Sequence, residues 1–364
     1  MTEIPLIQIG VGGVGRALVA QLRAGRALHQ ARGLVFRHVV LADSSGVIVA
    51  GPRDFLADTL LDVVVRGKAE GRSLAQQRLA TDGAALDTLL ASAPWSWAVV
   101  VDTTAANASE MGPTLRGAVA CGYGVVLANK KPLTSDLTLW EALTETGTLG
   151  YEATVGAGLP VIRTLQMLRD VGDPPHRIEG ALSGTLGFLM SELQVGRSFA
   201  DAVREAKQRG WTEPDPRDDL SGMDVARKAL IMARTLGLRL SMGDIRVEPL
   251  YPPDMADLSL TTFMTALEAL NDPMAAQVAE AQRGGKRLRY AAQIDVEAAR
   301  INVGLRAVAA DSALGSLRGA DNLVAFHTAH YHDSPLVVQG AGAGTTRTAC
   351  AVIADLLRCG TQSR

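Results

Sequence analysis

The chain has 364 residues, of which 47% are hydrophobic and 20% are charged. This length is typical of about two domains with enough apolar material for buried cores. The net charge of −2 offers no basic field for a phosphate backbone, so nucleic acid is excluded as an expected partner.

The three cysteines, Cys121, Cys350 and Cys359, are odd in number and far apart. This argues against a disulfide framework and fits a reducing cytoplasm. The N-terminus lacks the basic start and long apolar core of a signal peptide. Apolar runs are interrupted well before the roughly 18 residues that a membrane span needs. We therefore expect a cytoplasmic protein with no membrane partner.

Strand and helix patterns alternate over residues 1–150, which we expect to form the first domain. Apolar runs predict buried strands at 4–9, 36–42, 97–101 and 124–128. Helical spacing predicts helices at 14–24, 79–90 and 112–121. The segment 51–74 is expected to be a long loop. This alternation predicts an α/β fold with a Rossmann-type, doubly wound parallel sheet covered on both faces.

The pattern changes near Tyr151, where we place the start of a second, α+β domain at 151–342. Helices are expected at 161–170, 199–209 and 221–236, a strand at 177–182, and a turn at 183–185. Alternation over 286–333 indicates a mixed or antiparallel sheet. A last helix, 343–359, is expected to return to the first domain.

A Gly-x-Gly-x-x-Gly turn, formed by Gly10, Gly12 and Gly15, joins the first strand to the first helix. The first glycine permits the tight turn, the second lets a pyrophosphate approach the backbone, and the third lets the helix pack closely on the strand. The N–H groups around Gly13 and Val14 would face the phosphates. The turn predicts dinucleotide binding; an ordinary glycine-rich turn is the alternative.

Asp43 ends the second predicted strand, where a carboxylate accepts hydrogen bonds from a ribose 2′-hydroxyl and favours NAD. Ser44, Ser45 and Arg53 leave room for a 2′-phosphate, so NADP stays open. A simple turn residue is the alternative role for Asp43.

Polar residues follow two further strands, with Thr103 and Thr104 after one and Lys130 after the next. The carboxyl ends of parallel strands form the edge that binds ligands. A single lysine there would usually be a solvated loop charge, but two strand ends that converge on one crevice favour a functional site.

The segment 210–228 is rich in acidic residues on a proline-containing loop, followed by Asp224 and Lys228 one helical turn apart. Structural accounts exist: Ser221 and Asp224 fit a capping box, and Asp224 with Lys228 fits an i,i+4 pair worth about 0.3 kcal/mol. A divalent-metal loop is a third account, although the spacing is not that of an EF-hand. Functionally, a lysine among carboxylates can transfer a proton, and carboxylates can hold an ammonium group. That combination suits a small amino-acid substrate that carries an alcohol or aldehyde.

The chain resembles homoserine dehydrogenase in segments that occur in the family's order and span nearly its whole length. These segments are 10–15, 102–104, 128–132, 151–160, 180–185, 210–228 and 337–344. The resemblance implies reversible, NAD(P)H-dependent reduction of L-aspartate 4-semialdehyde to L-homoserine, on the route to threonine, methionine and isoleucine. It also implies a homodimer built largely from the strands after residue 286, which makes 151–342 the substrate-binding and dimerisation domain.

The resemblance also implies roles for individual residues. Lys228 would transfer the proton, assisted by Lys130 beside the nicotinamide and substrate. The expected substrate-binding residues are Glu213, Asp219, Asp224, Gly184 and Thr185. The expected cofactor-binding residues are Gly10, Gly12, Gly13, Val14, Gly15, Asp43, Thr103, Thr104, Lys130 and Gly342.

The family binds a monovalent cation, usually sodium, and the resemblance places its ligands at Glu152, Val155, Ala157 and Leu159. A flexible turn before a helix is the alternative account of that segment. The chain departs from many members in lacking a C-terminal regulatory domain, so feedback inhibition through one is not expected. Trp211 is also bulkier than the usual residue at its position.

Two alternatives remain: a reductase of the same fold that acts on another small amino acid, and a non-catalytic NAD(P)-binding sensor. A separate metal site is conceivable at His327, His330 and His332, with the last two on one strand face. Polar strand residues at an edge or dimer interface are the simpler account of these histidines.

Overall fold

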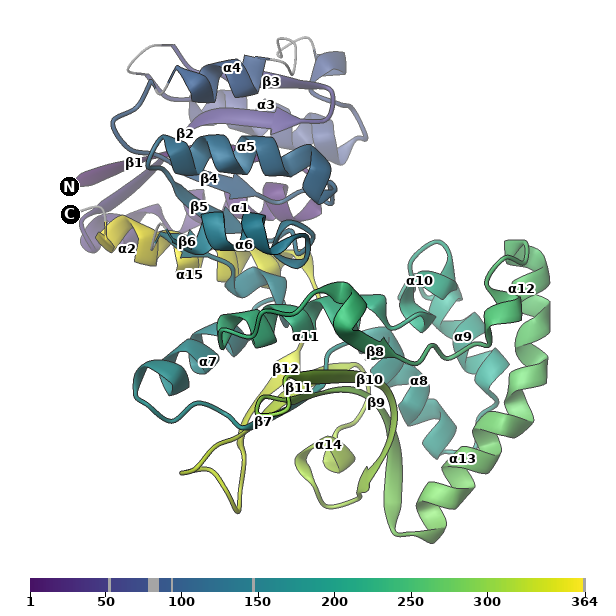
Figure 1. The fold of residues 1–364 in the computed structure, drawn as a ribbon. Helices are drawn as coiled ribbons and strands as arrows, with labels where there is room; N and C mark the ends of the chain where they lie inside the picture. The colour runs from purple at the N-terminus through teal and green to yellow at the C-terminus, as the bar shows by residue number, and fades with distance from the viewer. Residues whose placement is uncertain (52–53, 78–84, 93, 146–147, 363–364) are drawn as a thin grey trace. The chain divides into compact units, whose positions relative to one another are not determined.

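The computed structural model describes residues 1–364 except 52–53, 78–84, 93, 146–147 and 363–364. The chain forms two compact units, drawn in Figure 1. Unit 1 comprises Met1–Gly158 and Ala343–Arg364, and unit 2 comprises Leu159–Gly342. Among the described residues, no helix is both long and apolar enough to cross a membrane.

Unit 1 contains a six-stranded sheet in the order β3-β2-β1-β4-β5-β6. Its strands are β1 (Thr2–Ile9), β2 (Leu34–Asp43), β3 (Gly46–Val49), β4 (Val99–Asp102), β5 (Gly124–Leu127) and β6 (Leu149–Gly150). All neighbours pair in parallel except β2 and β3, which are antiparallel. The four predicted strands and the Rossmann-type α/β class are confirmed.

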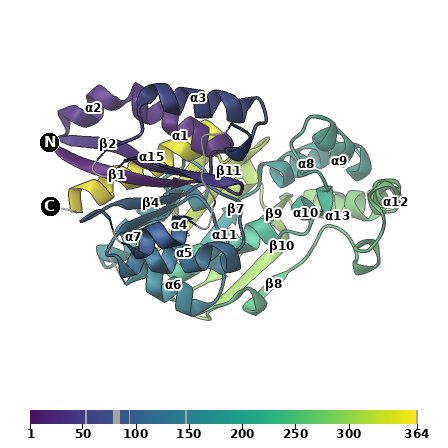
Figure 2. The ribbon, with the colours of Figure 1, turned by 90° about the horizontal axis from the view of Figure 1, so that it is seen from above.

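Helices cover both faces of this sheet, as Figure 2 shows, with α1, α2, α3 and α15 on one side and α4, α5 and α6 on the other. They are α1 (Gly13–Ala24), α2 (Arg26–Ala31), α3 (Asp58–Ala69), α4 (Ala85–Ala91), α5 (Ala108–Ala120), α6 (Leu137–Thr144) and α15 (Thr345–Gln362). Leu18 and Leu22 of α1 share one core cluster with Val352 and Leu356 of α15. The C-terminal helix therefore packs within unit 1.

The expected loop at 51–74 is wrong, because α3 occupies much of it. Leu61 and Val64, three residues apart, are buried against the sheet, and Asp62 and Val63 between them are exposed. The charged residues of this segment made its short apolar stripe difficult to recognise as a helical pattern in the sequence. The predicted helix at 79–90 lies partly outside the described residues, which resume within it at Ala85.

Unit 2 contains a mixed six-stranded sheet in the order β12-β11-β7-β9-β10-β8. Its strands are β7 (Arg177–Ala181), β8 (Ile245–Val247), β9 (Lys286–Asp295), β10 (Arg300–Ala309), β11 (Asp321–His327) and β12 (Leu336–Ala341). Only β8 and β10 among these described pairs are parallel. The mixed sheet predicted from the alternation over 286–333 is confirmed.

The helices of unit 2 are α7 (Val161–Asp170), α8 (Gly184–Gln194), α9 (Phe199–Gln208), α10 (Pro216–Leu220), α11 (Met223–Thr235), α12 (Leu260–Ala266), α13 (Asn271–Arg283) and α14 (Ala313–Ser316). Figure 1 shows α11 on one face of the sheet and the short α14 on the other. Leu314 and Leu317 of the α14 region pack on Ala181, Ala291 and Leu323.

Three predictions for this unit need correction. The expected turn at 183–185 is the start of α8, whose N-cap Ser183 accepts a hydrogen bond from the Leu186 amide. The helix expected from residue 221 begins at Met223, after Gly222 adopts a left-handed conformation with φ of 73°. The predicted Ser221–Asp224 capping box is therefore wrong, because Gly222 is the N-cap residue.

Candidate active site

The glycine turn lies between β1 and α1, with Gly12 and Gly13 exposed at the start of the helix. Gly10 has φ of +98°, and a Cβ there would lie 2.8 Å from atoms of Thr103. A Cβ on Gly15 would lie 2.1 Å from the Gly10 carbonyl oxygen. Only glycine fits these two positions without displacing the backbone. The turn thus leaves the N-terminus of a twelve-residue helix open to an anion.

Asp43 ends β2, as predicted, and its carboxylate is occupied by groups of unit 1. Lys68 Nζ lies 2.5 Å from Asp43 Oδ2, and the Ser45 hydroxyl donates to Asp43 Oδ1 at 2.6 Å. Burial acts to raise the pKa of Asp43, but these hydrogen bonds outweigh it and hold the pKa below its usual value. Lys68, on α3, was not expected from the sequence because its segment was assigned to a loop. Arg53 lies outside the described residues.

The polar residues that follow β4 and β5 are tied together by Asp102 and Asn129. Asn129 Nδ2 donates to Asp102 Oδ2 at 3.0 Å, and the Thr104 amide donates to Asp102 Oδ1 at 2.8 Å. Burial raises the pKa of Asp102, although these hydrogen bonds oppose the shift. The two predicted strand ends therefore meet at one edge, where Thr103, Thr104 and Lys130 are each half-buried. Asp102 and Asn129 belong to the segments 102–104 and 128–132, but the sequence did not predict the hydrogen bond that joins the two segments.

The adjacent lysine, Lys131, forms hydrogen bonds to the loop that follows β4. Its ammonium donates to the Ala105 carbonyl at 2.7 Å and to Asn107 Oδ1 at 3.0 Å. These bonds hold the loop after β4 against the loop after β5. Lys131 therefore has a structural role in connecting these two loops.

Lys228 is the most buried ionisable group of the segment 210–228. It lies on α11 and is only 8% exposed. Its ammonium lies 2.8 Å from Asp224 Oδ2 and donates to the Leu182 carbonyl at 2.5 Å. A buried lysine is tolerated when its donors are satisfied in this way. The predicted i,i+4 pair is present, and the Leu182 carbonyl joins it from the end of β7.

The acidic loop before α11 folds back on itself and on α8. The Glu213 amide donates to Asp219 Oδ2 at 2.8 Å, and the Thr185 hydroxyl donates to the Trp211 carbonyl at 2.7 Å. Burial raises the pKa of Asp219, and the negative charges of Glu213 and Asp224 raise it further. Raised pKa values of this kind mark carboxylates held close together, a feature of functional sites.

Asp215, another acidic residue of this loop, has structural contacts. Asp215 is the N-cap of α10 and accepts from the Arg217 amide at 3.0 Å. Arg217 also forms an ion pair with Asp215 at 2.6 Å. Trp211, which is 46% exposed, packs edge-on against Phe188 with ring centroids 5.0 Å apart. Within unit 2, the structure therefore places Gly184, Thr185, Glu213, Asp219, Asp224 and Lys228 on three connected segments.

The segment proposed to hold a cation turns sharply after β6. Glu152 is only 6% exposed, and its amide donates to Asp355 Oδ2 of α15 at 2.8 Å. Gly156 and Ala157 have φ values of 80° and 55°. A left-handed alanine is uncommon and indicates a backbone held in place by its surroundings. Carboxylate and backbone carbonyl oxygens are ligands that hard cations prefer. Leu159, across the unit boundary, has a carbonyl that accepts from the Val161 amide at 2.8 Å.

The histidines are not arranged as expected. His327 ends β11 and lies 3.0 Å from Glu179, whereas His330 lies 3.0 Å from Asp173. The expectation that His330 and His332 share a strand face is wrong, because β11 ends at His327 and both later histidines lie in a bend. Gly342 follows β12, and a Cβ there would lie 2.0 Å from Asn322, so a side chain is excluded.

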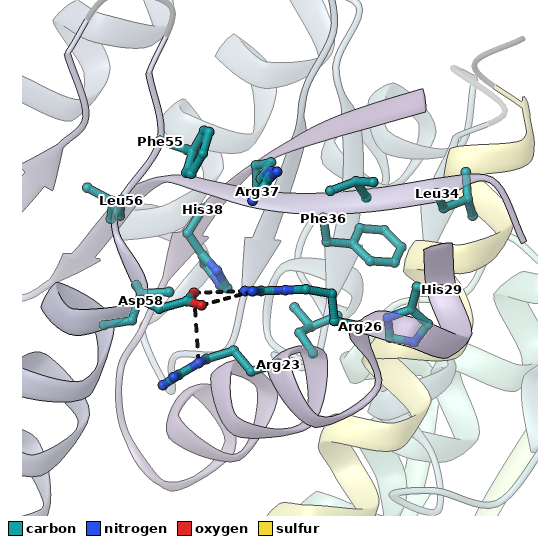
Figure 3. Close-up of a pocket in the computed structure, with 13 residues that line it drawn as sticks. Arg23, Arg26, His29, Leu34, Phe36, Arg37, His38, Phe55, Leu56 and Asp58 are labelled. Atoms are coloured by element: carbon teal, nitrogen blue, oxygen red, sulfur yellow. Dashed lines mark hydrogen bonds and ion pairs between the residues drawn. The ribbon is translucent and has the colours of Figure 1, made fainter. Parts of the chain in front are cut away.

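Figure 3 shows a pocket between β2 and the helices α1, α2 and α3. Arg26 donates to both oxygens of Asp58, at 2.9 and 2.8 Å, and Arg23 Nε lies 3.8 Å from the same carboxylate. The pocket is lined by the amino-terminal half of β2, from Leu34 to His38. Ligands of parallel sheets bind at the carboxyl ends of the strands. This pocket is therefore separate from the glycine turn and from Asp43.

A doubly wound sheet with a glycine turn, followed by a buried lysine among carboxylates, defines an NAD(P)-dependent oxidoreductase of the class that acts on alcohols. Comparisons with known proteins narrow this class. The profile of the homoserine dehydrogenase family matches residues 160–357. Homoserine dehydrogenase of Emericella nidulans is 40% identical over 368 residues, which cover 96% of each chain. The chain belongs to the homoserine dehydrogenase family.

Solved structures agree with this fold. A Candida auris protein of unknown function is 30% identical with a TM-score of 0.87, and the match covers 100% of this chain and 99% of that one. The homoserine dehydrogenase of Thermoplasma acidophilum, 21% identical, has a TM-score of 0.72 and covers 99% of this chain and 100% of its own. The second likeness concerns the fold alone.

Proposed function

We propose that this protein is a homoserine dehydrogenase that interconverts L-aspartate 4-semialdehyde and L-homoserine with NAD(P)(H). The observation that carries the proposal is the buried Lys228, whose Nζ lies 2.8 Å from Asp224 Oδ2 at the end of an acidic segment. A non-catalytic sensor would have no need to bury an ammonium group beside carboxylates. Reduction of an aldehyde, in contrast, needs a positioned proton donor.

The chemistry divides between cofactor and protein. The dinucleotide, when bound, supplies or accepts the hydride at the substrate carbon. Lys228 gives a proton to the carbonyl oxygen in reduction and takes it back from the hydroxyl in oxidation. Asp224 and the Leu182 carbonyl fix the direction of its ammonium. Lys130, on the edge formed by β4 and β5, assists beside the nicotinamide and the substrate.

The substrate would be held by its charged amino-acid end. Glu213 and Asp219 would bind the substrate ammonium or hydroxyl, since carboxylates form strong charge-assisted hydrogen bonds. Gly184 and Thr185, at the N-terminus of α8, would contact substrate backbone atoms. The N-terminal end of a helix favours the substrate carboxylate in the same region.

Unit 1 would be the dinucleotide-binding domain. The phosphates would lie against the turn formed by Gly10, Gly12, Gly13, Val14 and Gly15. Asp43 would face the ribose next to the adenine, with Lys68 beside it to receive a 2′-phosphate. Thr103, Thr104, Lys130 and Gly342 would lie near the nicotinamide half. The site suits either NAD or NADP, because Asp43 favours a 2′-hydroxyl and Lys68 favours a phosphate.

Two further features belong to the proposal. Glu152 with the carbonyls of Val155, Ala157 and Leu159 would bind sodium.

Unit 2 would dimerise through the strands after residue 286, because the short α14 covers only one end of one face of its sheet. The other end of that face carries Glu179, His327 and the 37%-exposed Val337. A place in threonine and methionine synthesis, in the cytoplasm, follows from the same proposal.

The deciding experiment follows absorbance at 340 nm with L-homoserine, in separate reactions with NAD and NADP. Homoserine-dependent formation of NAD(P)H supports the proposal. Turnover only with other small hydroxy amino acids would identify the reductase alternative. Dinucleotide binding without turnover on any of them would identify the sensor.

A further inference from the structure

Two polar side chains, Gln8 and His38, lie inside unit 1 on strands whose other buried side chains are apolar. Gln8, on β1, is fully buried, and His38, on β2, is only 5% exposed. The side chains next to Gln8, Ile7 and Ile9, are typical of a central parallel strand. A buried amide is costly unless its hydrogen-bonding groups are satisfied. The hydrogen-bond partners of Gln8 and His38 should therefore explain why polar residues occupy these buried positions.

Their hydrogen bonds form a chain that ends in the glycine turn. His38 Nε2 lies 2.9 Å from Gln8 Oε1. Gln8 Nε2 lies 3.0 Å from the Gly10 carbonyl oxygen and 3.1 Å from the Gly15 carbonyl oxygen. Because the amide nitrogen donates to both carbonyls, its oxygen must accept and His38 Nε2 must carry the hydrogen. Figure 3 shows His38 projecting from β2 on the side where Arg26 and Asp58 lie.

The chain sets the orientation of one peptide unit in the turn. The Gly10 carbonyl accepts from Gln8 and also from the Thr103 hydroxyl, at 2.8 Å. In a trans peptide the following N–H points opposite to the carbonyl. Holding the Gly10 oxygen toward the interior therefore directs the Val11 N–H outward. The second bond, to Gly15, ties the same amide to the first turn of α1.

We propose that Gln8, itself held by His38, is a positioning residue for the dinucleotide phosphates. It acts through the backbone: it orients the Gly10–Val11 peptide and the N-terminus of α1, whose N–H groups would touch the phosphates. The inference rests on the proposed function, since it concerns the dinucleotide site. It adds a determinant that the Gly-x-Gly-x-x-Gly pattern does not contain.

The test replaces Gln8 by methionine, which has similar length and cannot form these hydrogen bonds. In Gln8→Met we expect the Kd and KM for the dinucleotide to rise about tenfold, as is typical when the support of a binding group is lost. The kcat at saturating dinucleotide and the KM for homoserine should stay unchanged. Calorimetric titration gives the Kd, and initial rates give the KM and kcat.

A matched control separates positioning from general destabilisation. Leu115→Ala removes buried contacts of α5 and should lower the Tm without changing the dinucleotide KM. His38→Leu should raise the Kd by a smaller factor, because it releases Gln8 without removing it. In the Gln8→Met background, His38→Leu should have no further effect, since it acts through Gln8. If Gln8→Met fails to fold, the Kd of His38→Leu carries the test.

Three outcomes would overturn the inference while leaving the proposed function intact: an unaltered dinucleotide Kd in Gln8→Met, an equal loss of dinucleotide affinity in Leu115→Ala, or an equal effect of His38→Leu in both backgrounds. With Gln8→Met unfolded, an unaltered Kd in His38→Leu would overturn it. Failure of the unsubstituted protein to bind any dinucleotide would instead refute the proposed function.

Discussion

Asp43 and Lys68 form an ion pair at the carboxyl end of β2, with Lys68 Nζ 2.5 Å from Asp43 Oδ2. A carboxylate at this position selects for a ribose hydroxyl, whereas an ammonium attracts a 2′-phosphate. The same pair thus contains one determinant for each dinucleotide. We therefore expect the balance between these two residues to set the preference between NAD and NADP.

Removal of the carboxylate should shift the preference toward NADP. In Asp43→Asn, Lys68 loses its charged partner, so we expect the KM for NAD to rise about tenfold, as expected for a lost charge-assisted hydrogen bond. The KM for NADP should fall or stay constant. Lys68→Met should do the reverse and raise mainly the KM for NADP. Glu70→Gln, which neutralises an exposed carboxylate at the end of α3, is the control. Equal changes for both dinucleotides would contradict this assignment.

Lys228→Ala should abolish turnover and leave dinucleotide binding unchanged. Loss of a positioned proton donor is expected to reduce kcat by about 10³-fold. Lys286→Ala, at an exposed position on β9, is the matched control and should retain full activity. Stopped-flow rates and calorimetric Kd values separate the two effects. Substantial turnover in Lys228→Ala would rule out its role as the proton donor.

Asp219 should make stability depend on pH in the direction opposite to that of most carboxylates. Burial and the neighbouring carboxylates raise its pKa, so the folded state favours the protonated form. Its contribution to stability is therefore present at low pH and lost as pH rises through the folded pKa. Asp219→Asn should raise the Tm at pH 8, by about 2 °C for each kcal/mol of relieved cost.

The gain in Asp219→Asn should shrink as pH falls, because the native carboxylate then becomes neutral as well. Activity should move the other way, since the substrate ammonium loses a charged partner, with kcat/KM lower by about tenfold. Thermal unfolding across pH 4–9, a range chosen around the usual carboxylate pKa values, checks the sign. A Tm difference that grows toward acid pH would disprove the assignment.

Sodium should stabilise the protein through Glu152. When NaCl replaces choline chloride at constant ionic strength, the Tm of the native protein should rise, because a ligand that binds only the folded state stabilises it. Glu152→Gln should lose this response. Glu145→Gln, an exposed carboxylate at the end of α6, should keep it. An identical Tm of the native protein in both salts would exclude the site.

The uncovered end of the unit 2 sheet should be a dimer interface. Val337→Glu places a charge on this face and should shift the protein toward monomers in light-scattering chromatography, because a buried unpaired charge opposes association. Val195→Glu, at the end of α8 and 78% exposed, is the control. Monomeric native protein at micromolar concentration would refute the dimer.

Local patterns were sufficient for the regular elements. The short, Val-rich runs at 99–101 and 124–127 favour buried strands, and the glycine turn between a strand and a helix favours a dinucleotide-binding turn. The charged helix α3 was missed because its apolar stripe is short, and its burial depends on the sheet. Lys68 was missed with it.

The sequence by itself determined the fold class, the glycine turn and the candidate residues of the segment 210–228, because each depends on neighbours a few positions apart. Only the tertiary structure decided what those residues contact. Lys228 meets the Leu182 carbonyl, Asn129 meets Asp102, and Gln8 meets His38. Each pair is separated by 27 to 46 positions. Such contacts depend on strand order and register, which long-range packing sets and no local pattern encodes.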